Sequence, residues 1–114
     1  MLCTATWTAY VRGDIHRLRA PLGSRGREQT GARFAVILQS DDLMLSTVLV
    51  APTSRSARAS SFRPTIAIGG ERTLVLVEQT SAVASERLGQ LVGHVSCKEL
   101  DGIDDALRIA LQLD

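Results

Sequence analysis

Short apolar runs separated by turn-forming residues make up most of the chain. The runs are rich in Val, Ile, Leu and Thr. Glycine, proline and aspartate recur between them, which predicts short β-strands joined by tight connections. Five or six such strands predict a small, coiled antiparallel sheet or barrel. The expected strands cover residues 14–18, 32–40, 45–52, 64–68, 73–79 and 91–96.

A different periodicity appears near the end of the chain. Apolar residues recur there every three or four positions, at Leu100, Ile103, Leu107 and Leu111. This spacing predicts one amphipathic helix of about four turns that packs on the sheet. Ser96 and Glu99 have the spacing of a capping box, which fixes the expected start of the helix. Gly102 slightly lowers the helix propensity of this segment.

The length of the chain limits the number of domains, and its charge limits the kind of partner it binds. A chain of 114 residues is expected to form one domain. We place this domain at residues 12–114 and treat residues 1–11 as an N-terminal extension that is free to move. The formal net charge is only +1, but residues 1–63 carry nine arginines against four acids, whereas residues 64–114 carry four cations against eight acids. Such a division allows one positive face on a nearly neutral molecule.

Several classes of protein are disfavoured by what the sequence contains. Cys3 and Cys97 match no metal or redox spacing, so we expect reduced thiols in a cytoplasmic protein. His16 and His94 are isolated, and no glycine-rich nucleotide motif occurs, so neither a metal nor another cofactor is expected. No stretch approaches the ~20 apolar residues of a membrane span. The remaining possibilities are an enzyme that needs no cofactor, or a protein that only binds a partner.

Two polar segments and one strand end suggest such chemistry. Residues 20–32 and 53–62 are rich in Arg, Ser and Gly and poor in acids, which suits a mobile rim that binds phosphate. Arg33 opens the strand that follows the first segment. If this strand pairs antiparallel with residues 45–52, Arg33 meets the corner formed by Thr53 and Ser54. Together with Glu28, these groups provide a base, a cation and a hydroxyl, which is sufficient for cleavage of RNA without a metal.

At these residues the sequence resembles a known family. The motifs are "RGDIHRL" at 12–18, "REQTGARFAVILQSD" at 27–41, "LSTVLVAPTS" at 45–54, "VEQ" at 77–79 and "RLG" at 87–89. In this order and spacing they resemble the MazF/PemK family of toxin endoribonucleases, over nearly the whole chain. The resemblance implies a mainly β fold, a barrel-like, SH3-like twisted antiparallel sheet with a C-terminal α-helix. It also implies a homodimer, an RNA substrate and a cognate antitoxin.

The resemblance assigns roles to individual positions. The catalytic arginine of the family falls on Arg33, the hydroxyl after the strand-ending proline falls on Ser54, and the loop carboxylate falls on Glu28. Thr53 is the neighbouring candidate for the hydroxyl. Glu78 is the second candidate acid, and its alternative role is that of a surface acid at a strand end. The residues expected to bind RNA are Arg25, Arg27, Gln29, Arg55, Arg58 and Gln79.

The chain also departs from the family pattern. Arg27 stands where a small polar residue or histidine is common, Phe34 replaces the proline after the catalytic arginine, and His16 replaces an aromatic residue. The implied reaction is metal-independent cleavage that leaves a 2′,3′-cyclic phosphate and a 5′-OH. Two alternatives remain open, a toxin of the same fold that poisons gyrase without cutting RNA, and an RNA-binding barrel. The first of these relies on a C-terminal tryptophan, whereas the only tryptophan here is Trp7.

Overall fold

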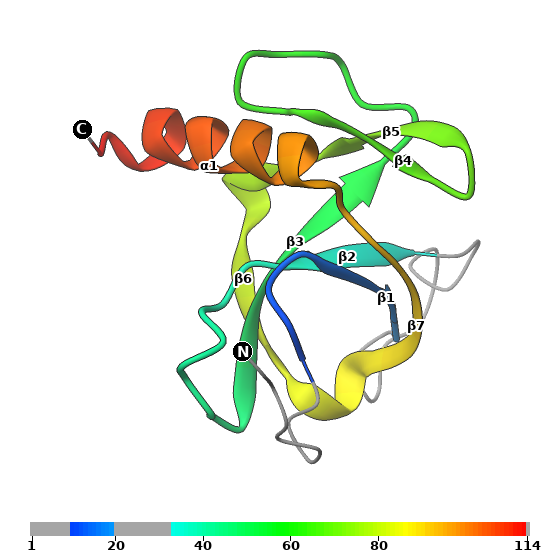
Figure 1. The fold of residues 1–114 in the computed structure, drawn as a ribbon, viewed down its shortest axis with the longest axis vertical. Coiled ribbons are helices and arrows are strands. Elements are labelled where there is room, and N and C mark those ends of the chain that lie inside the picture. Colours follow the sequence, from blue (N-terminus) through cyan, green and yellow to red (C-terminus); the bar gives the residue numbers. More distant parts are fainter. Residues whose placement is uncertain (1–9, 20–32, 114) are drawn as a thin grey trace.

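The computed structural model describes residues 10–19 and 33–113, which form a curled sheet with a helix packed against it (Figure 1). Within these residues the chain forms seven strands, two short 3-10 helices and one α-helix. In chain order they are β1 (Asp14–Leu18), β2 (Phe34–Ile37), β3 (Thr47–Ser54), β4 (Thr65–Ile68), β5 (Glu71–Val75), η2 (Val77–Gln79), β6 (Ser81–Ala84), η3 (Ser85–Arg87), β7 (Leu88–His94) and α1 (Cys97–Leu111).

The strands pair in one continuous antiparallel arrangement. Their order is β4-β5-β3-β2-β1-β7, and β6 pairs with the first half of β3. The long strand β3 therefore belongs to both parts of the sheet, because its end pairs with β5 at Thr53↔Val75 and Ser54↔Leu74. This curled, mainly β fold with a C-terminal helix confirms the fold class predicted from the sequence.

Strand β2 is covered on both of its faces, which explains its nearly unbroken apolar run. Val36 packs with Ile103 and Ala106 of α1 in one core cluster. Ala35 and Ile37 point the other way, into a second cluster inside the curl of the sheet. Alternate side chains of a strand lie on opposite faces, so a strand buried on both faces has few positions left for polar residues.

Helix α1 begins where the sequence predicts. The Ser96 hydroxyl accepts a hydrogen bond from the Glu99 amide at 3.0 Å, and the Glu99 carboxylate accepts one from the Ser96 amide at 2.8 Å. This reciprocal capping box satisfies two amides that have no partner within the helix. The other Glu99 oxygen accepts from the Ala67 amide at 2.9 Å, so the same side chain also connects the helix to β4.

The strand prediction is wrong in the part of the chain from β5 to β7. Residues 73–79 do not form one strand, because β5 ends at Val75 and the chain turns through η2, where the Thr80 hydroxyl donates to the Val77 carbonyl at 2.7 Å. Strand β6 was not predicted, and β7 begins at Leu88 rather than at residue 91. Buried apolar residues continue through Leu76 and Val77, so hydrophobicity alone does not reveal the turn.

The folded domain includes residues just before the expected boundary at residue 12. The Tyr10 ring packs edge-on against His16 with 5.5 Å between ring centroids. Its hydroxyl donates to the Ser85 carbonyl at 3.4 Å. Contacts with the sheet therefore begin at Tyr10 in the described part of the chain.

Candidate active site

An open cavity of about 550 Å³ lies where the start of β2, the end of β3 and the β4–β5 hairpin meet. Three arginines and one carboxylate line it, together with hydroxyl and apolar side chains. Its lining residues are Arg17, Arg33, Phe34, Thr53, Ser54, Arg55, Ile68, Gly69, Glu71, Thr73 and Val92. The cavity therefore combines positive charge, hydroxyl groups and an apolar wall.

Arg33 reaches this cavity because of the pairing of β1, β2 and β3. Strands β2 and β3 run antiparallel with Ala35 opposite Pro52, so Arg33 lies at the same end of the sheet as Ser54. The Arg33 carbonyl accepts a hydrogen bond from the Leu18 amide at 2.9 Å, which fixes its backbone against β1. The predicted convergence of Arg33 with Thr53 and Ser54 is confirmed.

The hydroxyl groups of Thr53 and Ser54 make different contacts. The Thr53 hydroxyl donates to the Phe34 carbonyl at 3.2 Å, so its proton is used within the sheet. The Ser54 oxygen instead accepts hydrogen bonds from the amides of Ser56 and Ala57, at 3.2 and 3.0 Å. A hydroxyl that accepts two amide protons keeps its own proton available to a neighbouring group. The Ser54 oxygen also lies 3.5 Å from the Ser56 hydroxyl, a long contact in which either group can donate. Unlike the Thr53 proton, the Ser54 proton is not donated to the backbone, so Ser54 is the better placed of the two to donate to a bound molecule.

Glu71 is the only carboxylate among the described residues that line the cavity. It forms an ion pair with Arg55, and both side chains are well exposed to solvent. Arg55 is thereby partly neutralised in this state, whereas no carboxylate of residues 10–19 or 33–113 pairs with Arg17 or Arg33. The net charge of the described lining is positive.

Arg17 and Phe34 are site residues that the sequence interpretation missed. They are direct partners across β1 and β2, and the Arg17 guanidinium lies over the Phe34 ring, 5.4 Å from its centroid. The departure from the family pattern at Phe34 was noted in the sequence. Its connection to Arg17 depends on the register of the two strands, which the sequence does not specify.

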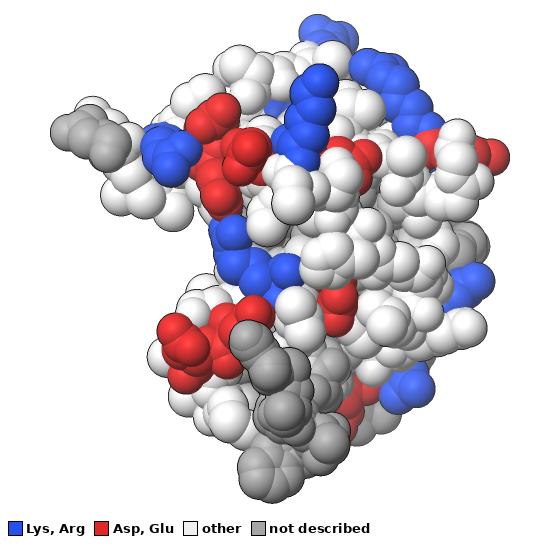
Figure 2. All heavy atoms as spheres, viewed as in Figure 1, with Lys and Arg blue, Asp and Glu red and all other residues white. Residues whose placement is uncertain are grey.

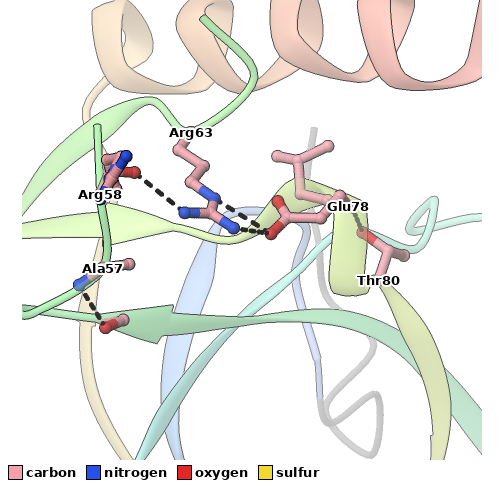
Figure 3. Close-up of polar contacts among 7 residues, drawn as sticks. Ala57, Arg58, Arg63, Glu78 and Thr80 are labelled. Atoms are coloured by element: carbon pink, nitrogen blue, oxygen red, sulfur yellow. Dashed lines mark hydrogen bonds and ion pairs between the residues drawn. The ribbon is translucent and has the colours of Figure 1, made fainter. Parts of the chain in front are cut away.

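Glu78 lies outside this cavity, in η2 (Figure 3). Its carboxylate accepts hydrogen bonds from two guanidinium nitrogens of Arg63, at 2.6 and 3.0 Å. Arg63 also donates to the Arg58 carbonyl at 2.9 Å, so it connects η2 with the segment after β3. The hydrogen bond from Arg63 holds the pKa of Glu78 below its usual range, against a smaller opposing effect of burial.

Of the residues expected to bind RNA that lie in the described part of the chain, Arg55 lines the cavity. Arg58 and Gln79 do not line the cavity, although Arg58 lies in the segment that follows Ser54. Four of the predicted site residues lie outside the part of the chain that the structure describes. These are Arg25, Arg27, Glu28 and Gln29.

The charged side chains on one face of the molecule are interspersed (Figure 2). Acidic and basic groups alternate over this face, and Arg12, for example, donates to Asp104 at 2.6 Å. The positive face considered from the charge division of the sequence is not formed on the side shown. Within the described residues, positive charge gathers instead at the cavity lined by Arg17, Arg33 and Arg55.

The described residues show no arrangement typical of a metal site or a membrane span. No three His, Cys, Asp or Glu side chains come together as metal ligands within residues 10–19 and 33–113. The Nδ1 atom of His16 lies 2.9 Å from the Gly89 carbonyl, and that of His94 lies 2.8 Å from the Asp14 carboxylate. In the same part of the chain, no helix has the length and apolar character needed to cross a bilayer.

The chain belongs to the family of PemK-like, MazF-like toxins of type II toxin–antitoxin systems. The model of this family matches residues 11–111, nearly the whole chain. The resemblance seen in the sequence motifs is therefore confirmed.

Individual relatives agree with this assignment. One relative is Rv3098A of Mycobacterium tuberculosis (strain ATCC 25618 / H37Rv), a protein provisionally named as a toxin. It is 37% identical to this chain over 73 residues, which are 64% of this chain and 69% of the relative. Endoribonuclease EndoA of Bacillus subtilis (strain 168) is 27% identical over 112 residues, 90% of this chain and 94% of EndoA.

A solved structure shows that the fold is shared. It is that of an endoribonuclease in complex with its cognate antitoxin from Mycobacterial species, and it matches with a TM-score of 0.75. The match covers 93% of this chain and 98% of the other at 20% identity. This likeness supports the curled sheet and helix described above.

Proposed function

We propose that the protein is a toxin that cleaves RNA internally, without a metal ion and at selected sequences. The observation that carries this proposal is the meeting of Arg33 and Ser54 at one positively lined cavity, in a chain that belongs to a toxin family. The name of the relative EndoA, an endoribonuclease that aligns with 90% of this chain, supports the same activity.

The proposed reaction uses the ribose next to the cleaved phosphate. A base removes the proton of the 2′-OH, and the 2′-oxygen forms a bond to phosphorus. The bond from phosphorus to the 5′-oxygen then breaks, and that oxygen takes up a proton. The products are a 2′,3′-cyclic phosphate and a 5′-OH. Glu28 is the proposed base, and Glu78 is a weaker candidate because its carboxylate is engaged by Arg63 outside the cavity.

Arg33 and Ser54 stabilise the charge that develops on the phosphorane oxygens. A guanidinium can donate two parallel hydrogen bonds to two such oxygens. Ser54 donates its hydroxyl proton, while the amides of Ser56 and Ala57 fix its oxygen in place. Donors that are held in place before the reaction need little reorganisation when the charge appears, and this lowers the barrier.

The proposal includes two protein partners. A cognate antitoxin would inhibit the enzyme, and the shared fold with an endoribonuclease solved in complex with its cognate antitoxin supports this part. A second copy of the chain would complete a homodimer, as the family resemblance implies. Exposed apolar side chains between β2 and β3, at Leu43, Met44 and Leu45, offer surface for such contacts.

The decisive experiment uses an RNA oligonucleotide that contains a cleavage site mapped from 5′-OH ends in total RNA. We expect cleavage in the presence of EDTA, and none when the ribose at the cut position is replaced by deoxyribose, because the nucleophile is then missing. A control oligonucleotide has one deoxyribose elsewhere and should be cut normally. Cleavage of the first deoxy-substituted strand, or a need for a divalent cation, would refute the mechanism.

A further inference from the structure

We infer that Arg17, held on the ring of Phe34, binds the RNA phosphate next to the one that is cleaved. This inference rests on the proposed ribonuclease function and adds a second phosphate subsite to the same cavity. Arg17 lines that cavity together with Arg33 and Ser54, although it comes from a different strand.

The position of Arg17 follows from the register of β1 and β2. Arg17 lies directly opposite Phe34, and Arg33 immediately precedes Phe34 in the chain. The hydrogen bond from the Leu18 amide to the Arg33 carbonyl, 2.9 Å long, fixes this register at the mouth of the cavity. Arg17 of β1 and Arg33, which immediately precedes β2, therefore both line one cavity.

The contact with Phe34 orients the Arg17 side chain without using its hydrogen-bond donors. The guanidinium carbon lies 5.4 Å from the ring centroid, within the range of a cation–π interaction. A guanidinium that lies over an aromatic ring keeps its N–H groups available for bidentate contact with a phosphate. Phe34 acts here as a positioning residue.

The charges around Arg17 also favour an anionic ligand. Arg55 pairs with Glu71 and Arg63 pairs with Glu78, but none of the carboxylates in the described part of the chain pairs with Arg17. Two like charges that line one cavity repel each other, and a bound anion relieves this repulsion. RNA supplies one phosphate for each nucleotide, so consecutive phosphates can engage Arg33 and Arg17 in turn.

The test varies the number of phosphates in the substrate. A dinucleotide with the cleaved phosphate alone is compared with trinucleotides that carry one more phosphate on the 5′ or the 3′ side. The enzyme variants are Arg17→Met, which keeps an apolar stem against Phe34, and Arg72→Met as the matched control. Arg72 is an exposed arginine of β5 that does not line the cavity.

We expect Arg17→Met to lower kcat/KM by about tenfold for one of the two trinucleotides and to leave the dinucleotide almost unchanged. A methylphosphonate at the added linkage should reduce the wild-type rate to that of the variant and have no effect on the variant itself. Phe34→Leu should show a smaller loss for the same trinucleotide, and Arg72→Met none. Equal losses for all substrates, or no loss for any, would overturn the inference.

A binding measurement separates this inference from the proposed function. Trinucleotides with deoxyribose at the cut position cannot be cleaved through the 2′-OH, and their affinity is measured by fluorescence anisotropy. If the wild type binds RNA but does not cut it, the proposed function fails, while the Arg17 subsite is still tested by the loss of affinity in Arg17→Met. The subsite is refuted if affinity for the longer strand is the same in both proteins.

Discussion

At the scale of single residues, the structure distinguishes two adjacent hydroxyl groups that the sequence does not. Thr53 and Ser54 both follow Pro52, and either could supply the catalytic hydroxyl. The Thr53 proton is donated to the Phe34 carbonyl, whereas the Ser54 oxygen accepts two amide protons and shares only a long, 3.5 Å contact with the Ser56 hydroxyl. This difference depends on how the chain turns after β3, which is a property of the folded backbone.

Removal of the two proposed transition-state donors should reduce the rate of RNA cleavage strongly. We expect Arg33→Ala and Ser54→Ala each to lower kcat by about 10²-fold or more, with a smaller effect on RNA affinity, because the charge they stabilise develops during the reaction. Single-turnover cleavage of the mapped oligonucleotide measures this effect.

Thr53→Val is the matched control for these variants, because it removes a hydroxyl and keeps the shape of the side chain. It should cost about 1 kcal/mol in the free energy of unfolding, through the lost bond to the Phe34 carbonyl, and affect the rate little. If Thr53→Val abolishes cleavage while Ser54→Ala is silent, the placement of the hydroxyl at Ser54 is wrong.

At the scale of elements, the sequence was informative wherever local chemistry decides the structure. The capping box of Ser96 and Glu99 marked the start of α1, and the apolar run within residues 32–40 marked a strand, which the structure places at β2. The predicted meeting of Arg33 with Ser54 was also correct, because it needed only the antiparallel pairing of two consecutive strands.

The sequence was misleading where long-range pairing decides the structure. The short strand β6, with the sequence "SAVA", has only one β-branched residue, Val83, and is formed by pairing with β3. The pairing of Arg17 with Phe34 depends on a register between strands separated by residues 19–33. Such features cannot be predicted from the pattern of one segment alone.

The ion pair of Glu78 with Arg63 should make a small, pH-dependent contribution to stability. Arg63 connects η2 with the segment after β3 through Glu78 and the Arg58 carbonyl (Figure 3). The pKa of Glu78 is lower in the folded state than in the unfolded chain, because of the hydrogen bond from Arg63. The contribution is therefore fully present above the unfolded pKa of about 4.5 and is lost as the pH falls through the folded value.

Glu78→Gln should remove this dependence. We expect a loss of at most about 1 kcal/mol in the free energy of unfolding at pH 7, since the pair is partly exposed, and a smaller difference from the wild type below pH 4. Urea unfolding at several pH values measures both. A difference that grows as the pH falls would contradict the assigned role of the pair.

At the scale of the whole molecule, the two oppositely charged parts of the sequence are joined by ion pairs. Arg12 pairs with Asp104, Arg55 with Glu71 and Arg63 with Glu78, and each pair connects an arginine of residues 1–63 with a carboxylate of residues 64–114. These three of the nine arginines of residues 1–63 are therefore paired with carboxylates within the fold. Arg17 and Arg33 line the cavity and pair with no carboxylate in residues 10–19 or 33–113, so we expect an anionic chain to bind there.

RNA and the antitoxin should therefore compete for this one surface. An acidic, disordered antitoxin segment can fold on binding, placing its carboxylates against Arg17 and Arg33 and its apolar side chains against Ile68 and Val92 of the cavity.

We expect a purified antitoxin fragment to displace labelled, uncleavable RNA from the wild-type protein in a fluorescence anisotropy titration. In the Arg17→Met variant both ligands should bind more weakly, and the affinity of the wild type for each should fall as salt is added, because both contacts are ionic. In a homodimer two such cavities are related by a two-fold axis, so light scattering of the complex should give a mass that contains two toxin chains. Inhibition of cleavage while the RNA stays fully bound would show that the antitoxin acts at a separate site, and would refute the shared surface without changing the assignment of the nuclease.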